Sequence, residues 1–364
     1  MATEEQLRRA REQRIAQRAA ARAERAAATA GTAAPARSRP TRGPRRAGVA
    51  GLVRRPAPAY RRRRLAALAV LVALLVGLAL AVAGLGGSDS GDGSEQPAAG
   101  PPPRPELPRG GHSILPERRV VAYYGAPQDD ELGILGIGSP ELAARRLERQ
   151  ARAYAEPRRP VLPTLELIAV VAAAHPGDDG TYALRQSDAV IRRYLRAARR
   201  AEALLMLDIQ PGRSDFLAEA QRLRKWLREP DVSLAIDPEW RVTAPEVPAQ
   251  VIGHVDADEV NATSAWLSRL VEGERLPDKL FLIHQFTDDM VDETALRPRK
   301  GLDVVLNADG FGSRVVKKQK YHRFTRQAPG FHQGFKLFYK EDVDLMPPPR
   351  VLRMKPPPDV VIYE

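Results

Sequence analysis

Eight short apolar runs alternate with longer amphipathic segments along the second half of the chain. Each run has strand character, because it is rich in Val, Leu and Ile and several of the runs finish in a polar residue. The runs are Val120–Gly125, Val161–Val170, Ala203–Gln210, Ser233–Trp240, Leu280–Phe286, Asp303–Gly310, Gly334–Asp342 and Asp359–Glu364. This pattern predicts strands that are buried on both faces, which is typical of a parallel sheet covered by helices.

Helix signals lie between these runs. Ser139, Ser187 and Ser214 each precede a segment in which apolar residues recur at helical spacing, and Ser is a preferred N-cap residue. Asp256 and Glu259 have the spacing of a capping box ahead of a further helix. The later connections carry weaker helix signals, at Thr287–Leu296, Ser313–Arg326 and Met346–Met354.

The alternation of strands and helices predicts an α/β fold, a TIM-like (β/α)8 barrel over residues 114–364, since eight strand–helix units fill about 250 residues. The eighth run reaches the last residue, so we expect the last outer helix to be missing. An open doubly wound sheet is the alternative. It is disfavoured because no Gly-rich phosphate loop follows an early run, and Gly136–Ser139 is too short to form one.

The charge of the chain is concentrated in its first part. Residues 1–64 hold 18 Arg, no Lys and 4 Glu, a charge of +14, whereas the other 300 residues carry a charge of −2. The barrel is therefore close to neutral, and we expect no binding of nucleic acid there. The Arg-rich segment is predicted to be a largely disordered cytoplasmic tail.

An uncharged apolar segment of 23 residues, 65–87, follows the tail. It is long enough to cross a hydrocarbon core of about 30 Å, and Arg61–Arg64 directly before it favour an N-terminus inside the cell. We predict a single-pass plasma-membrane protein with an extracytoplasmic barrel behind a Gly/Ser/Pro-rich linker, residues 88–113. A secretory signal cleaved after Ala83 is the alternative, although a leader of 64 residues is long for it.

Carboxylates close several of the predicted strands. The carboxyl ends of barrel strands meet at one rim, and residues two apart on a strand face the same side. Asp237 and Glu239 end the fourth run, where one carboxyl group held protonated and one held ionised would suit acid catalysis at a glycosidic bond. We predict Glu239 as the acid and Asp208, Asp237 or Asp309 as the second carboxylate. A structural ion pair is the alternative.

Further polar and aromatic residues are predicted around the same rim, each with a structural role as its alternative. The predicted substrate-binding residues are Tyr124, Glu166, Gln210, Trp240, His284, Gln285, Asn307 and Tyr339. The chain has no Cys, and its six His show neither H-x-H nor H-x-x-x-H spacing. We therefore expect no cofactor and no metal at the site, while a Ca²⁺ or Mg²⁺ site made of carboxylates alone is left open.

The Asp237–Glu239 step resembles the fourth-strand carboxylates of barrel glycoside hydrolases that act on N-acetylated sugars, the chitinase-like and muramidase-like families. The resemblance implies that Glu239 is the acid and that Asp237 positions an acetamido group. The earlier acids of the chitinase motif fall on Val232 and Ala235 in this sequence. From Val120 onwards the chain also resembles an uncharacterised family of membrane-anchored, glycosidase-like barrels from high-GC bacteria, which implies a fold but no established activity.

Together these features predict a membrane-anchored enzyme of the cell envelope that acts on a glycosidic bond of a cell-wall or surface polysaccharide. A non-catalytic glycan-binding or scaffolding barrel is the first alternative. The second is a metal-dependent phosphodiester or deacetylase barrel, which requires Asp208, Asp237, Glu239 or His284 to converge. The sequence leaves the polymer and the oligomeric state open.

Overall fold

The computed structural model describes residues 103–364, so the predicted tail, the predicted membrane span and most of the predicted linker lie outside the described residues. Eight parallel strands form a closed barrel, in which β1 (Arg119–Gly125) pairs with β2 (Val161–Ala172) on one side and β9 (Val360–Tyr363) on the other. The strands between them are β4 (Leu204–Ile209), β5 (Val232–Ile236), β6 (Lys279–Gln285), β7 (Leu302–Ala308) and β8 (His332–Leu337). The predicted TIM-like barrel is confirmed.

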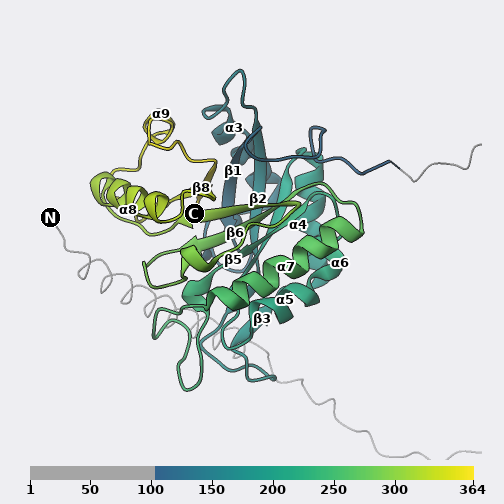
Figure 1. Cartoon of the computed structure of the whole chain (residues 1–364), viewed down its shortest axis with the longest axis vertical. Helices are drawn as coiled ribbons and strands as arrows, with labels where there is room; N and C mark the ends of the chain where they lie inside the picture. Colours follow the sequence, from purple (N-terminus) through teal and green to yellow (C-terminus); the bar gives the residue numbers. More distant parts are fainter. Residues whose placement is uncertain (1–102) are drawn as a thin grey trace, which may run out of the picture. The chain divides into compact units, whose positions relative to one another are not determined.

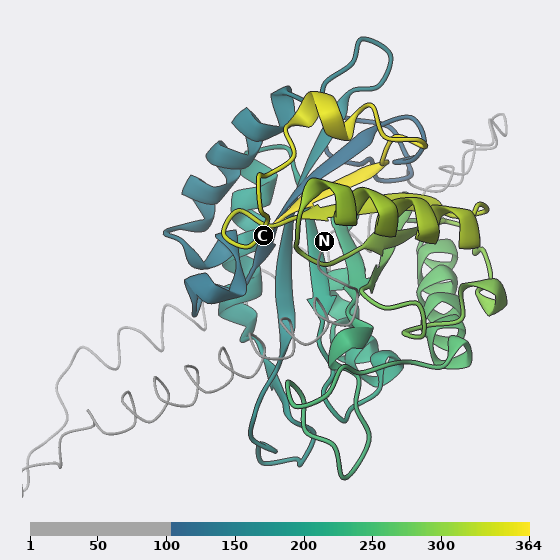
Figure 2. The same ribbon diagram turned by 90° about the vertical axis from the view of Figure 1, so that its left-hand side faces the viewer.

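Helices fill the connections and lie against the outside of the strands (Figure 1). Helix α3 (Pro140–Arg152) packs on α4 (Asp188–Arg200), and α5 (Phe216–Arg222) packs on α7 (Ala257–Gly273). Figure 2 shows α3 on one side of the strands and α8 (Arg314–Gln327) on the other. The shorter elements are α6 (Arg224–Leu227), α9 (Pro348–Val351) and the 3-10 turns η1 (Asp130–Leu132), η2 (Ile134–Gly136), η3 (Pro238–Trp240) and η4 (Glu293–Ala295).

No helix within residues 103–364 has the length and apolar character needed to cross a membrane.

The helix caps agree with the sequence signals in part. Ser139 and Ser187 cap α3 and α4 as predicted, because each side chain accepts a backbone N–H three residues further on. Asp215 rather than Ser214 caps α5, and Asp256 makes no side-chain cap at α7. Neighbouring polar residues compete for the same backbone groups at a helix end, so the pattern located the helices better than their caps.

Two apolar layers stabilise the barrel. The outer layer lies between the strands and the helices, and the inner layer fills the barrel with alternate strand residues such as Ala122 and Met206. Leu107, Ile114 and Leu115, from the segment ahead of β1, belong to the inner layer and are buried. The packed part of the chain therefore begins ahead of residue 114, inside the predicted linker.

The fourth barrel strand is shorter than the sequence predicts. Strand β5 ends at Ile236, and Asp237 begins the 3-10 turn η3 instead of continuing the strand. The side chain of Asp237 accepts a hydrogen bond from the backbone N–H of Glu239, and Pro238 brings a fixed φ and no N–H of its own. A short antiparallel strand, β3 (Ala183–Arg185), pairs with the end of β2 and is absent from the sequence prediction.

Candidate functional site

Polar side chains from every strand of the barrel, or from the residue just after it, lie at its carboxyl end. We call this group the mouth cluster. It consists of Tyr124, Glu166, Asp208, Asp237, His284, Asn307, Asp309, Lys336 and Glu364. All of them are buried except Glu364, which is 10% exposed. Of the residues predicted at this rim, the structure brings together Tyr124, Glu166, Asp208, Asp237, His284, Asn307 and Asp309, while their roles stay predictions.

His284 lies at the centre of the mouth cluster. Its Nε2 is 2.9 Å from Oε1 of Glu166, and its Nδ1 is 3.1 Å from Oδ2 of Asp309. Burial and the nearby Lys336 act to lower the pKa of His284, but the carboxylates of Glu166 and Asp309 outweigh them and raise it well above its usual value. The two carboxylates therefore favour the charged form of the imidazole, which joins Glu166 and Asp309. Asn307 also contacts Nδ1, at 3.1 Å.

Lys336 on β8 supplies the ammonium group of the cluster. Its Nζ lies 2.9 Å from Oε2 of Glu364 and 3.2 Å from Oδ2 of Asp309, and 3.7 Å from the centre of the Tyr124 ring. Burial acts to lower the pKa of Lys336, but these carboxylates raise it above its usual value. Lys336 is therefore a fixed cation rather than a free amine. The sequence analysis missed both Lys336 and Glu364, although alternation along β8 indicates an inward Lys336.

Asp208 is held by an aromatic hydroxyl group. Tyr124 donates its hydroxyl hydrogen to Oδ2 of Asp208 at 3.1 Å, and Gln210 donates to the Tyr124 oxygen at 3.0 Å. Gln210 in turn accepts a hydrogen bond from the backbone N–H of Ala172, which connects this series of hydrogen bonds to β2. Burial raises the pKa of Asp208 to about 7, Glu166 adds to the rise, and the nearby His284 opposes it.

Asp237 and Glu239 lie at the edge of the mouth cluster on the turn η3. Each is 3% exposed. Burial raises the pKa of Asp237 well above its usual value, the charges of Asp208 and Glu239 add to the rise, and His284 opposes it. These surroundings therefore favour the neutral form of the Asp237 carboxyl group. The predicted pair is present, but it belongs to a turn and not to one face of a strand.

Three predicted substrate-binding residues take other positions. Gln285 donates to Glu293 of η4, since neighbouring residues of a strand face opposite sides and His284 faces inward. Trp240 ends η3 and is only partly buried. Tyr339 is 38% exposed and stacks on the ring of Tyr363, with ring centres 5.2 Å apart. These three residues therefore contribute to the rim and to packing.

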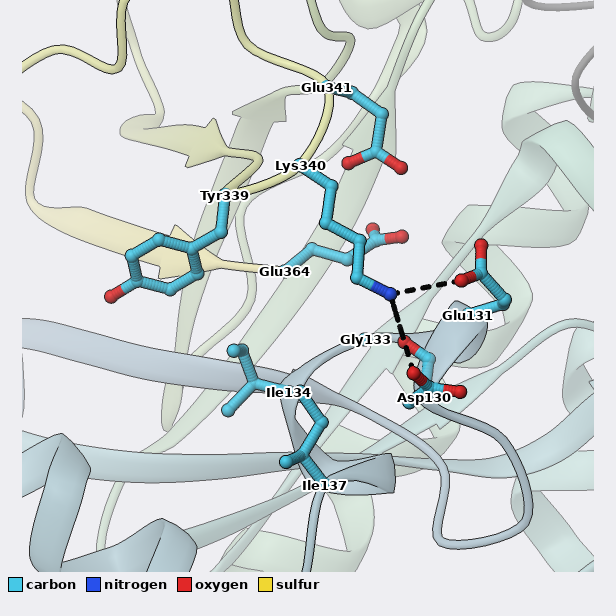
Figure 3. A pocket seen from close by; sticks show the side chains of 9 residues that line it. All are labelled: Asp130, Glu131, Gly133, Ile134, Ile137, Tyr339, Lys340, Glu341 and Glu364. Atoms are coloured by element: carbon cyan, nitrogen blue, oxygen red, sulfur yellow. Dashed lines mark hydrogen bonds and ion pairs between the residues drawn. The ribbon is translucent and has the colours of Figure 1, made fainter.

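A small surface hollow of about 70 Å³ lies beside the mouth cluster (Figure 3). Its lining residues are Asp130, Glu131, Gly133, Ile134, Ile137, Tyr339, Lys340, Glu341 and Glu364. Lys340 pairs with Glu131 at 2.9 Å, as the close-up shows. Glu364 lines the hollow and also contacts Lys336, so this one side chain connects the hollow with the cluster.

Three residues of the cluster are grouped as the ligands of a metal ion would be. Glu166, Asp208 and His284 each offer one ligand atom, and these atoms lie within 4.8 Å of one another. All three residues are buried. Carboxylate oxygens and an imidazole nitrogen together suit divalent transition metals. No local motif predicts this group, because its residues come from three separated strands.

The domain is similar in fold to two solved structures of one enzyme. They are the Ruminococcus gnavus sialic acid aldolase as a catalytic lysine mutant and in its wild-type form, with 12% and 10% identity and TM-scores of 0.35 and 0.34. The matches cover 68% of this chain and 67% and 68% of those chains. No protein-family model and no curated protein sequence matches the chain. At these TM-scores the likeness carries no argument about activity.

The predicted hydrolysis of a glycosidic bond is wrong. The described geometry differs from the two exposed carboxyl groups that such a reaction needs on opposite sides of a sugar bond. Glu239 and Asp237 are enclosed on a turn, Asp208 is bonded to Tyr124, and Asp309 is paired with Lys336.

The alternative prediction of a non-catalytic glycan-binding barrel is corrected together with the prediction of glycosidic hydrolysis. That prediction required a rim whose carboxylates are all neutralised by Arg or Lys, or a mouth plugged by Trp240 and Tyr124. Lys336 pairs with Asp309 and Glu364. Within residues 103–364, however, Glu166 forms no ion pair with Arg or Lys, and its hydrogen-bond partner is His284. The mouth cluster therefore contains a carboxylate, that of Glu166, which is not paired with Arg or Lys as this alternative requires.

Proposed function

We propose that the described domain is an enzyme whose reaction takes place at the mouth cluster, with Asp237 as the proton donor to a substrate oxygen. The observation that supports it is a carboxyl group, 3% exposed, whose pKa is raised well above its usual value by burial and by the charges of Asp208 and Glu239. Barrel enzymes have their active sites at this end of the strands. A carboxyl group with a raised pKa is suited to general acid catalysis near neutral pH.

The surroundings of Asp237 favour a small polar substrate that carries a carbonyl group. The side chains of the cluster are almost completely enclosed, which suits a small molecule better than a polymer. A proton donor close to the fixed charge of Lys336 polarises a carbonyl oxygen strongly, because the site excludes water. Glu239, on the same turn, is the candidate base for a proton on the carbon beside the carbonyl group.

Hydrogen exchange in heavy water tests this proposal. The purified protein is incubated with pyruvate or with dihydroxyacetone, and proton NMR follows the replacement of hydrogen by deuterium beside the carbonyl group. We expect exchange by the parent protein and a rate lower by about 100-fold in Asp237→Asn, since a positioned acid contributes about that factor. The exposed carboxylate of Asp178, between β2 and β3, provides the control Asp178→Asn, which should keep the parent rate. Equal rates in the parent and in Asp237→Asn would contradict the proposal.

A further inference from the structure

We infer that Glu166, Asp208 and His284 bind one divalent transition-metal ion at the mouth of the barrel. The three side chains come from β2, β4 and β6, which the barrel brings together. Their ligand atoms lie within 4.8 Å of one another. Two atoms bound on opposite sides of one ion, each at about 2.0–2.4 Å, have a similar separation. A single ion therefore reaches all three residues with small side-chain shifts.

Two oxygen atoms of this group have no partner in the protein. Oε2 of Glu166 and Oδ1 of Asp208 are buried, and neither forms a hydrogen bond. Both side chains are fully enclosed, at 0% exposure. Buried carboxylate oxygens are almost always hydrogen-bonded or bound to a cation, because burial removes their water. The second oxygen of each carboxylate is already held, by His284 and by Tyr124 respectively. A bound cation supplies the missing partner for both free oxygens.

The charges of the mouth cluster point to the same ligand. Apart from Asp237, whose raised pKa favours its neutral form, the cluster contains four acidic residues, Glu166, Asp208, Asp309 and Glu364, whereas its basic residues are Lys336 and His284. Lys336 is committed to Asp309 and Glu364. Glu166 and Asp208 are thus left with His284 as their close counter-charge. A dication placed between them neutralises the excess of buried negative charge.

The contacts around the three residues match those of metal ligands in proteins. A ligating His usually directs its second ring nitrogen at a carboxylate, which fixes the ring and its tautomer. Nδ1 of His284 is 3.1 Å from Asp309, and Asp309 is held by Lys336, so Nε2 is directed at Glu166. Tyr124 orients Asp208 in the same way from the other side.

A mixed set of one imidazole and two carboxylates selects the kind of ion. Ca²⁺ and Mg²⁺ prefer oxygen ligands alone, whereas Mn²⁺, Fe²⁺ and Zn²⁺ accept nitrogen as well. The three residues therefore favour Mn²⁺, Fe²⁺ or Zn²⁺.

Metal binding to the full-length protein tests the inference without any substrate. The protein is stripped with a chelator, Mn²⁺ is added, and electron paramagnetic resonance measures the free ion. We expect one Mn²⁺ per chain, held at least tenfold more weakly by Glu166→Gln and by Asp208→Asn. Asp289→Asn is the matched control, because Asp289 is an exposed carboxylate on the loop after β6, and it should bind Mn²⁺ as the parent does.

A measurement on the parent protein keeps the test decisive if the variants fail to fold. Pulsed electron paramagnetic resonance should detect an imidazole nitrogen coupled to the bound Mn²⁺. Parent protein that binds no Mn²⁺ at millimolar concentration, or bound Mn²⁺ without a coupled nitrogen, would overturn the inference. Affinity that is unchanged in both carboxylate variants would do the same.

The inference shares its location with the proposed function and does not depend on acid catalysis by Asp237. Mn²⁺ binding without deuterium exchange would support the metal site and refute the proposed reaction. Exchange that requires Asp237, in protein that binds no ion, would support the proposed reaction and refute the metal site.

Discussion

At the scale of single residues, Lys336 determines whether the mouth cluster is stable. It is 2% exposed and neutralises Asp309 and Glu364. Lys336→Met leaves both carboxylates without their ammonium partner in a site that excludes water. We expect the free energy of unfolding to fall by about 3–5 kcal/mol, which is the usual effect of removing one partner from a buried ion pair. Urea denaturation of the full-length protein measures this loss.

Lys340 provides the matched control for that substitution. It also pairs with two carboxylates, those of Asp130 and Glu131, but its side chain is 50% exposed. Lys340→Met should therefore change the free energy of unfolding by about 1 kcal/mol or less, because water screens exposed pairs. If the free energy of unfolding falls by a similar amount in the two variants, burial does not strengthen the ion pairs of Lys336.

The residues of the site were predictable where the strand pattern alone decides their position. Glu166, Asp208 and His284 interrupt or end apolar runs. A polar residue near the carboxyl end of a barrel strand lies at the mouth of the barrel. Lys336 was missed because a Lys near a strand end usually lies in solvent. Only the pairing of β8 between β7 and β9 encloses it. That contact joins distant parts of the chain and leaves no local sequence pattern.

At the scale of elements, eight apolar runs were enough to locate the eight strands, but not every strand end. The sequence placed Asp237 on a strand face, whereas Pro238 and the cap by Asp237 start a turn there. It also extended β8 to Asp342, which instead lies in the following loop and accepts from Gly312 and Phe338. Polar residues at a strand end bond to loop backbone, and this competition is invisible to hydrophobic patterning.

The contact between the start of β8 and the residue just ahead of β9 should stabilise the fold in a pH-dependent way that can be measured. His332 at the start of β8 lies 3.2 Å from Asp359, just ahead of β9, and Arg159 also pairs with Asp359. The hydrogen bond to Asp359 raises the pKa of His332, against the effect of burial. Burial acts to raise the pKa of Asp359, but the bonds from His332 and Arg159 lower it. The two pKa shifts therefore both reflect the ion pair between His332 and Asp359.

The sign of each shift gives the pH window in which this pair stabilises the fold. A raised His332 pKa gives stability that is complete below the usual value of about 6.5 and is lost as the pH rises through the folded-state pKa. A lowered Asp359 pKa gives stability that is present above about 3.9 and is lost as the pH falls. The contribution of the pair is therefore largest between about pH 4 and 6.5.

His332→Gln should remove the part of the stability that declines at higher pH. We expect the substitution to cost about 1 kcal/mol or less at pH 5.5, because the His332 side chain is 30% exposed, and to cost less at pH 8.5. Urea midpoints of the parent and the variant at both values measure the difference. A loss of the same size at pH 5.5 and pH 8.5 would show that packing rather than charge accounts for the effect.

At the scale of the whole molecule, closure of the barrel is the feature that the sequence supports only indirectly. Strand–helix alternation indicates a parallel sheet, but the pairing of β1 with β9 joins the two ends of the described domain. The absence of a Gly-rich phosphate loop disfavours an open doubly wound sheet, but no local pattern predicts the pairing of β1 with β9. The predicted membrane anchor at residues 65–87 lies outside the described residues and stays a prediction.

The barrel interior is sealed at its amino end by the segment that precedes β1, and the stability of the whole domain should depend on it. Ile114 from this segment is fully buried in the inner layer, together with Leu107 and Leu115. Ile114→Ala should lower the free energy of unfolding by about 2–5 kcal/mol, because it leaves a cavity in a closed space.

The contrast with an exposed apolar residue tests this role. Leu184 on the short strand β3 is 56% exposed, so Leu184→Ala should change the free energy of unfolding by about 0.5 kcal/mol or less. Urea denaturation of both variants measures the difference. If Ile114→Ala has no larger effect than Leu184→Ala, the barrel does not need the segment ahead of β1, and the folding unit begins at β1. If the expected loss is found, the stable unit extends ahead of β1 and includes the segment that contains Ile114.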